Sequence, residues 1–337
     1  MLAQLVWGCA VMIIVVVLVT FAVGLVIRHV CPKPLLITFA YSHYAEMARW
    51  ALVLSGTRFT EWKVPVGPHI LLVPLLRLLF SPASDDLDEE TSYPGGDVRY
   101  IRHPWWSLAR MRRFRRLSGV PLLIGTDFRC VRTSWGILRR CGFEVDPPTR
   151  RALDHDLGPS VRLLIYHCIF THSPSLYREL QSCETWGELQ LFDLCESLCR
   201  VSAYIKALLG VSPTNAAAAA NELRSTFSDL SETILCADPF FGKGDGATDF
   251  GGADLAFAAL SAPLFMPPSY ARGALRRLPL PSELGAEYES LRADLLESRA
   301  GKLVMQCYEE HRQRPPPPPP LGEQDGEQLL EEIRKKR

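Results

Sequence analysis

Three hydroxyl groups lie close together where the first predicted helix begins. Tyr41, Ser42 and Tyr44 follow a β-rich run over 35–39 and open an apolar helical pattern that ends at Leu54. Serine is a preferred N-cap, and the free amides and dipole of a helix N-terminus favour a nearby negative charge. Ser42 can therefore cap the helix only, or also donate a hydrogen bond to a bound anion, and the sequence leaves both roles open.

A second pair of hydroxyl groups opens a later helical pattern. Thr133 and Ser134 follow a strand-like run over 128–131 and precede a helix predicted to reach Arg140. The hydroxyl and amide at such a helix start can hold a carboxylate. A Thr-Ser cap without any ligand gives the same pattern.

The ten cysteines form no recognisable metal or redox motif. None is spaced as Cys-x-x-Cys, and neither Cys195 with Cys199 nor His167 with Cys168 supplies the four ligands of a zinc site. We therefore expect reduced thiols and no metal. Lys plus Arg and Asp plus Glu both number 37, so the chain lacks the basic excess of a general nucleic-acid binder.

The patterns along the chain predict the scaffold that positions these residues. Strand-like runs cover 35–39, 59–66, 120–124 and 128–131, and helical runs cover 42–54 and 134–140. This β-α-β…β-β-α order predicts a small mixed sheet with helices on its faces. After a linker at 142–150, helical patterns cover 150–171, 185–209, 216–236, 253–262 and 284–312.

The N-terminal run over 2–27 contains no charged residue. At 1.5 Å per residue it exceeds the ~30 Å hydrocarbon core of a bilayer. It lacks the positive start and shorter apolar stretch of a cleaved signal peptide. We therefore predict an uncleaved single-pass anchor. Arg28 and Lys33 follow it, which predicts that the C-terminal domain lies in the cytosol.

Three motifs in the sequence resemble those of a known family. Tyr41 to Leu52 (Y-S-H-Y-A-E-M-A-R-W-A-L) resembles the first strand-to-helix turn of the glutathione S-transferase family, especially in its bacterial-type members. Gly119 to Leu123 (G-V-P-L-L), followed by Thr133 to Ile137 (T-S-W-G-I), resembles its glutathione-site pattern. Phe250 to Leu260 resembles a helix of its C-terminal domain. The resemblance implies an α/β thioredoxin-like domain at 35–142, with an insertion at about 80–118, and an all-α domain at 150–312.

The resemblance also implies a site and a co-substrate. Ser42 would be the catalytic hydroxyl that stabilises the thiolate of glutathione, which then attacks an electrophile of unknown identity. Val120 and a cis-bonded Pro121 would meet the cysteinyl part of glutathione, and Thr133 and Ser134 its γ-glutamyl end. Thr133 departs from the acid or glutamine that the family usually places there. Cysteine-based disulfide chemistry is not expected, because neither Ser42 nor Ala45 is a thiol.

A second hypothesis is a non-catalytic, membrane-anchored binding or scaffold module that retains the fold. Thr133 and the insertion at about 80–118 favour it. The arginines and tryptophans at 99–116 could contact anionic lipid headgroups, or form a solvated loop neutralised by the acids at 85–90. The Pro-rich and charged tail over 313–337 contains an extended polyproline run. A homodimer is a further partner state that we keep open.

Overall fold

The computed structural model describes residues 33–66, 69–82, 120–181, 186–233, 250–271 and 273–312, together with Leu18 and Ala22. The predicted anchor, apart from these two residues, lies outside the described part, as do 83–118 of the predicted insertion and the tail over 313–337. Within the described ranges, no helix is long and apolar enough to cross a membrane.

A five-stranded mixed sheet forms the first half of the described chain. Its strands are β1 (Leu35–Thr38), β2 (Thr60–Lys63), β3 (Ser81–Pro82), β4 (Leu122–Ile124) and β5 (Arg129–Val131), in the order β2-β1-β4-β5-β3. Strand β1 is parallel to β2 and antiparallel to β4, and β3 is parallel to β5. The predicted small mixed sheet is therefore present. The two-residue strand β3 is too short to leave a recognisable pattern in the sequence.

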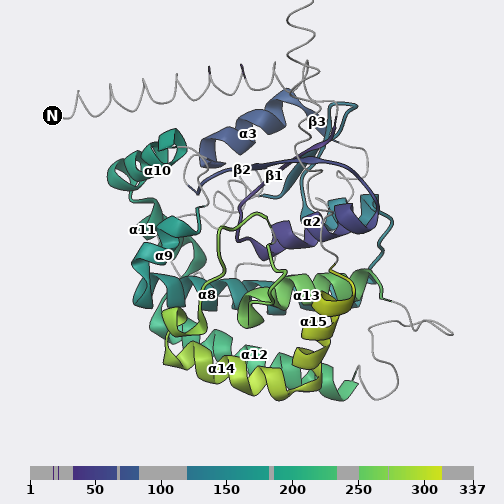
Figure 1. Cartoon of the computed structure of the whole chain (residues 1–337), viewed down its shortest axis with the longest axis vertical. Coiled ribbons are helices and arrows are strands. Elements are labelled where there is room, and N and C mark those ends of the chain that lie inside the picture. The colour runs from purple at the N-terminus through teal and green to yellow at the C-terminus, as the bar shows by residue number, and fades with distance from the viewer. Residues whose placement is uncertain are drawn as a thin grey trace, which may run out of the picture.

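Helices cover both faces of this sheet (Figure 1). Because side chains alternate along a strand, Leu36 packs with Ala48 of α2 (His43–Leu54) and Ile137 of α6 (Ser134–Arg140). Leu35 and its neighbour Ile37 instead pack against α3 (His69–Leu79). No element is predicted over 69–80, because Pro74 and Arg77 interrupt this apolar run. The structure accommodates Pro74 inside a helix whose Leu72 and Leu76 pack on the sheet.

The second half is helical, as predicted. Its α-helices are α7 (Pro147–Ala152), α8 (Gly158–His172), α9 (Pro174–Glu179), α10 (Trp186–Cys199), α11 (Val201–Leu209), α12 (Pro213–Thr233), α13 (Gly252–Phe265), α14 (Ala286–Glu297) and α15 (Arg299–Glu310). A π-helical turn over Leu153–Leu157 joins α7 to α8, and a 3-10 turn over Pro281–Leu284 precedes α14.

Several boundaries differ from the predicted ones. The linker predicted at 142–150 is partly helical, because Asp146 caps α7, which begins at Pro147. The helix predicted over 284–312 divides into α14 and α15 at Ser298, whose side chain caps the second helix. Arg200, in a left-handed conformation, divides the helix predicted over 185–209.

Helix α13 lies at the centre of the helical half, and almost all of its residues are buried. It packs against α2, so one hydrophobic cluster joins Trp50 of the first half to Phe257 and its neighbours in the second. Asp254 accepts a hydrogen bond from the Gly251 amide at 2.9 Å, which is the carboxylate half of a capping box. Asp254 thus has a folding role at the start of this buried helix.

Candidate functional site

The predicted site segments meet at one edge of the sheet. Strand β4 is antiparallel to both β1 and β5, so β1 and β5 run in the same direction and end at the same edge. Ser42 follows β1 and Thr133 follows β5. The pairing of Ile37 with Leu122 places the preceding Val120–Pro121 bond beside the end of β1. The topology therefore brings two helix starts and this turn together.

Ser42 is the N-cap of α2. Its backbone is extended, and its Oγ accepts a hydrogen bond from the Ala45 amide at 3.3 Å. The side chain is half-buried, and its hydroxyl hydrogen has no acceptor among the described residues. Because a hydroxyl can accept and donate at once, the observed cap leaves Ser42 able to donate to a ligand.

The two tyrosines of the same turn are engaged by the helical half. The Tyr41 hydroxyl lies 2.8 Å from the Tyr166 hydroxyl, and the Tyr44 hydroxyl donates to Asp154 at 3.4 Å. Burial raises the pKa of both Tyr41 and Tyr44 well above the ordinary value of a phenol, so both remain protonated. Among the three hydroxyls, Ser42 is the one without a side-chain partner among the described residues.

At the second helix start, the cap is Thr133 and Ser134 is the first helical residue. The Thr133 Oγ1 accepts a hydrogen bond from the Gly136 amide at 2.9 Å. Ser134 is buried, with 4% of its surface exposed. Val120 is half-buried, Pro121 is buried, and the bond between them is cis, as the resemblance predicts.

A buried ionic network lies directly behind the Ser42 turn. Glu46, in the first turn of α2, is fully buried, and its carboxylate lies 2.8 Å from Arg312 Nε and 3.5 Å from Arg49 Nη1. Arg49 also reaches Glu61 at 2.7 Å and donates to the Phe39 carbonyl at 2.9 Å. The network therefore fixes the end of β1, the start of α2 and strand β2 relative to one another.

Sequence reasoning missed this network. Its available signal is the spacing of Glu46 and Arg49, which places opposite charges one helical turn apart within an otherwise apolar helix. The third member, Arg312, lies 266 residues from Glu46. Burial alone would lower the pKa of Arg312, but the Glu46 carboxylate raises it above the ordinary value, so the guanidinium stays charged. The Trp50 indole N–H, which donates to the His311 carbonyl at 3.2 Å, adds a second link.

Buried histidines are the first residues of α2 and α3, which pack on opposite faces of the sheet. Burial lowers the pKa of His43 in α2 and of His69 in α3 to about 3. His43 also lies near the Arg162 cation, which lowers its pKa further. Both histidines are therefore neutral at neutral pH, and neither is an imidazolium that could act as an acid. The turn therefore offers hydrogen-bond donors and a helix dipole rather than a general acid.

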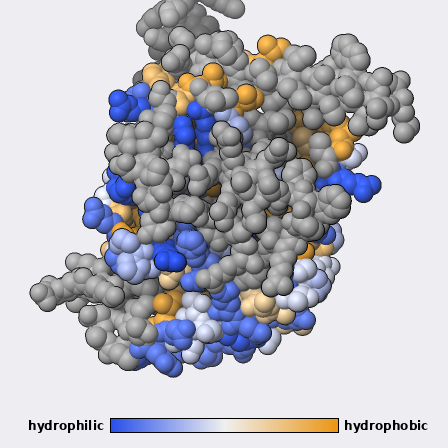
Figure 2. Space-filling model, turned by 180° about the vertical axis from the view of Figure 1, so that it is seen from behind, coloured by the Kyte–Doolittle hydropathy of each residue, from blue (hydrophilic) through white to orange (hydrophobic). Residues whose placement is uncertain are grey.

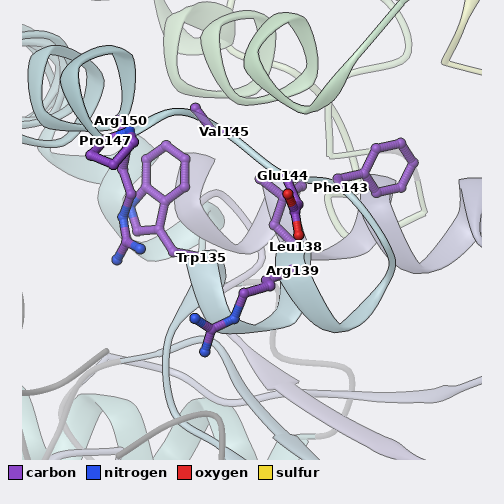
Figure 3. Close-up of a pocket in the computed structure, with 8 residues that line it drawn as sticks. All are labelled: Trp135, Leu138, Arg139, Phe143, Glu144, Val145, Pro147 and Arg150. Atoms are coloured by element: carbon purple, nitrogen blue, oxygen red, sulfur yellow. The ribbon is translucent and has the colours of Figure 1, made fainter. Parts of the chain in front are cut away.

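A separate hollow of about 220 Å³ is lined by residues of α6, of the segment over 143–145 and of α7 (Figure 3). The Trp135 ring forms part of its wall, and the Arg150 guanidinium lies 5.2 Å from the centre of that ring. None of the five predicted site residues lines this hollow. Among the described residues, no group of three or more His, Cys, Asp or Glu side chains could hold a metal ion.

No family model and no curated protein matches the chain. Solved structures similar to it include a tau-class glutathione S-transferase from mango, Mangifera indica, at 14% identity, covering 81% of this chain and 92% of that one with a TM-score of 0.34. A rice glutathione S-transferase solved with glutathione is 14% identical and covers 90% and 99%, with a TM-score of 0.38. A Phanerochaete chrysosporium glutathione transferase solved with oxidized glutathione is 11% identical and covers 84% and 97%, with a TM-score of 0.37.

The described chain combines a small mixed sheet, helices on both faces, a cis-proline turn before β4 and an all-helical second half. The mixed sheet and the helical second half fit the architecture that the three motifs predict.

Proposed function

We propose that this protein is a membrane-anchored glutathione S-transferase-like enzyme that conjugates glutathione to electrophiles. One observation carries the proposal. The start of α2 at Ser42, the start of α6 at Thr133 and the Val120–Pro121 turn gather at one edge of the sheet. That edge presents helix amides and a hydroxyl to an anion, as a tripeptide with a thiolate and two carboxylates would require.

Ser42 would act on the sulfur of glutathione. A free thiol has a pKa of ~8.5, so its thiolate is a minor form at neutral pH unless a donor or a helix N-terminus favours the anion. The Ser42 hydroxyl hydrogen and the dipole of α2 supply both. Ser134, at the start of α6, would hold the γ-glutamyl carboxylate, whose charge does not change during the reaction. Its contribution is therefore to binding.

Two substitutions separate these roles in full-length protein purified in detergent. Ser42→Ala should raise the pKa of the bound thiol and lower kcat/KM with a generic electrophile by about ten- to a hundredfold, the scale of a lost charge-assisted hydrogen bond. Ser134→Ala should instead mainly raise KM for glutathione. A melting curve of each variant controls for lost stability, including the lost cap of α2 in Ser42→Ala. Unchanged kinetics for Ser42→Ala would mean that another group activates the thiol.

A specific observation favours the non-catalytic alternative. Thr133 has no carboxylate for the glutathione amine, and its Oγ1 already accepts the Gly136 amide. Titration calorimetry of the full-length protein with millimolar glutathione distinguishes the two hypotheses. An enzyme must bind under these conditions. Absence of both binding and conjugation would leave a membrane-anchored scaffold that retains the fold.

The anchor is the second part of the proposal. The uncharged run over 2–27 should keep the protein in the membrane pellet after a carbonate wash. Because Arg28 and Lys33 flank it on the C-terminal side, protease added to vesicles with their cytosolic face outward should digest the large domain. Recovery of uncleaved protein in the supernatant would remove the anchor. Full protection from protease would reverse its orientation.

A further inference from the structure

Helix α3 has no exposed charged side chain. Its sequence, His-Ile-Leu-Leu-Val-Pro-Leu-Leu-Arg-Leu-Leu, contains no acidic residue, and both of its basic residues are buried. His69 packs edge-on against Phe39, and Arg77 donates to the Arg132 carbonyl at 2.9 Å. A surface helix ordinarily places charged residues opposite its buried face. Helix α3 instead exposes Leu79, at 39%.

Helix α10 carries a row of exposed leucines. Leu191, Leu194 and Leu198 are 40%, 49% and 63% exposed. Their spacing of three and four residues places them on one face of the helix. Phe192 and Cys195 are the residues that pack inward. Three neighbouring leucines on one helical face form a continuous apolar stripe, whereas isolated exposed apolar residues are ordinary.

Both features lie at the same end of the molecule. Figure 1 shows α3 along the top, between α10 on one side and β3 on the other. The opposite end, formed by α12 and α14, carries exposed charges such as the pair of Arg224 and Asp294 at 3.4 Å. From behind, strongly hydrophobic surface likewise appears mainly near the top (Figure 2).

The strand register places this end of the molecule close to the start of β1, which follows the apolar run over 2–27 in the sequence. Leu35 of β1 aligns with Ile124, which aligns with Cys130, which in turn aligns with Pro82 of β3. The start of β1 and the start of β3, two residues after Leu79, therefore lie at the same level of the sheet. Leu35 is eight positions after Ile27, which corresponds to at most about 29 Å of fully extended chain.

We infer that the α3–α10 surface, defined by Leu79, Leu191, Leu194 and Leu198, rests on the lipid bilayer and inserts its leucines at the interface. The inference rests on the proposed membrane anchor. A domain tethered this closely must turn some face to the lipid, and a face that exposes leucines, and to which α3 adds no exposed charge, loses least on leaving water. The proposed glutathione edge is at the opposite end of β1, so it stays open to the cytosol.

The occupant of this surface can be identified by photocrosslinking. The probe p-benzoylphenylalanine would replace Leu79 or Leu194 in the full-length protein, reconstituted into phosphatidylcholine vesicles and irradiated. Glu289, exposed on α14 at the far end, is the matched control position. We expect lipid adducts by mass spectrometry at positions 79 and 194, and none above the unirradiated background at 289. Leu198 is a replacement position on the same stripe if either variant folds poorly.

Each other outcome overturns the inference in a distinguishable way. Adducts between position 194 and peptides of the 2–27 run, or a second copy of the chain, would identify a protein occupant. Equal lipid adducts at 194 and 289, or none at either, in protein that resists carbonate washing would refute the surface while the anchor stands. Protein released by the carbonate wash would refute the anchor and, with it, this surface.

Discussion

Helices α2 and α3 pack on opposite faces of the same sheet, and of the two only α2 contains an acidic side chain. Helix α2 buries a carboxylate, Glu46, and a guanidinium, Arg49, beneath the helical half. Helix α3 buries its two basic residues and exposes no charge at all. Both helices are mostly apolar, so apolar composition alone does not distinguish them.

The difference reflects what each helix meets on its outer side. Helix α2 lies against α13 and the end of α15, and Arg312 supplies the charge that makes burial of Glu46 tolerable. Helix α3 packs on the sheet through Leu72 and Leu76, and Arg77 donates to the Arg132 carbonyl at 2.9 Å. We therefore regard α2 as a helix shaped by a protein neighbour, and α3 as the helix that the inferred bilayer contact would cover.

The largest expected effect is on the α2 side. Glu46→Ala leaves Arg312 and Arg49 buried without their shared carboxylate, which should lower the free energy of unfolding by about 3–5 kcal/mol. Urea unfolding of detergent-solubilised protein measures this. The control is Arg178→Ala, which breaks an exposed pair with Asp193 at 2.7 Å and should cost less than about 1 kcal/mol. Equal losses of stability in the two variants would contradict the conclusion that the buried Glu46 network contributes more than an exposed ion pair.

Acidification should lower the free energy of unfolding by a smaller amount, to which His43 of α2 and His69 of α3 contribute equally. The folded pKa of His43 and of His69 is about 3, below the unfolded value of about 6.5. Between these values the unfolded chain binds protons that the folded chain does not, so stability is present above pH 6.5 and falls as the pH drops. At pH 5 each histidine should cost about 2 kcal/mol.

His43→Gln and His69→Gln test this assignment. Each should remove about half of the histidine-dependent loss between pH 7.5 and pH 5, and the double variant should remove nearly all of it. Urea unfolding at both pH values provides the measurement. A single variant that abolishes the whole pH dependence would show that the two helices differ in this respect.

The cap of α2 should contribute about 1 kcal/mol. Ser42→Ala should lower stability by that amount, and Ser42→Asp should restore it, because a carboxylate also accepts the Ala45 amide. Only the hydroxyl can donate to a thiolate, so conjugation should remain impaired in Ser42→Asp. Thermal melting and a conjugation assay on the same samples check both statements. Restored activity in Ser42→Asp would reduce Ser42 to a cap.

The smallest effect should come from the exposed leucines. In detergent, Leu79→Ser and Leu194→Ser should each change unfolding free energy by less than about 0.5 kcal/mol, as most surface substitutions do. Leu76→Ala, at a fully buried position of the same helix α3, should cost about 2–5 kcal/mol. A large loss for Leu79→Ser would place that side chain in the protein core rather than at an interface.

Local patterns were sufficient to predict much of the fold. Alternating or continuous apolar runs identify β1, β4 and β5, and a serine before a helical period predicts the start of α2. Helix α3 was missed because Pro74 reads as a breaker, whereas packing of Leu72 and Leu76 on the sheet outweighs that penalty. Propensity cannot reveal such compensation, because it arises from tertiary contacts.

The sequence predicts which turns form the candidate site, but not which side chains surround them. Ser42, Val120 and Ser134 were chosen from motifs, and the topology does bring them to one edge. That Tyr41 and Tyr44 are engaged by Tyr166 and Asp154 could not be predicted, because those contacts cross more than a hundred residues of sequence. The contact of Arg312 with Glu46 escaped prediction for the same reason.

The contact between Glu46 and Arg312 also sets an order of events during biosynthesis. The two residues are 266 positions apart, so at 5–20 residues per second the ribosome adds Arg312 roughly 13–53 s after Glu46. Throughout that interval the nascent first domain holds a carboxylate whose final counterion has not yet been made. The first domain therefore cannot complete this network before Arg312 has been synthesised, and a message truncated before codon 312 yields a chain in which Glu46 lacks this counterion.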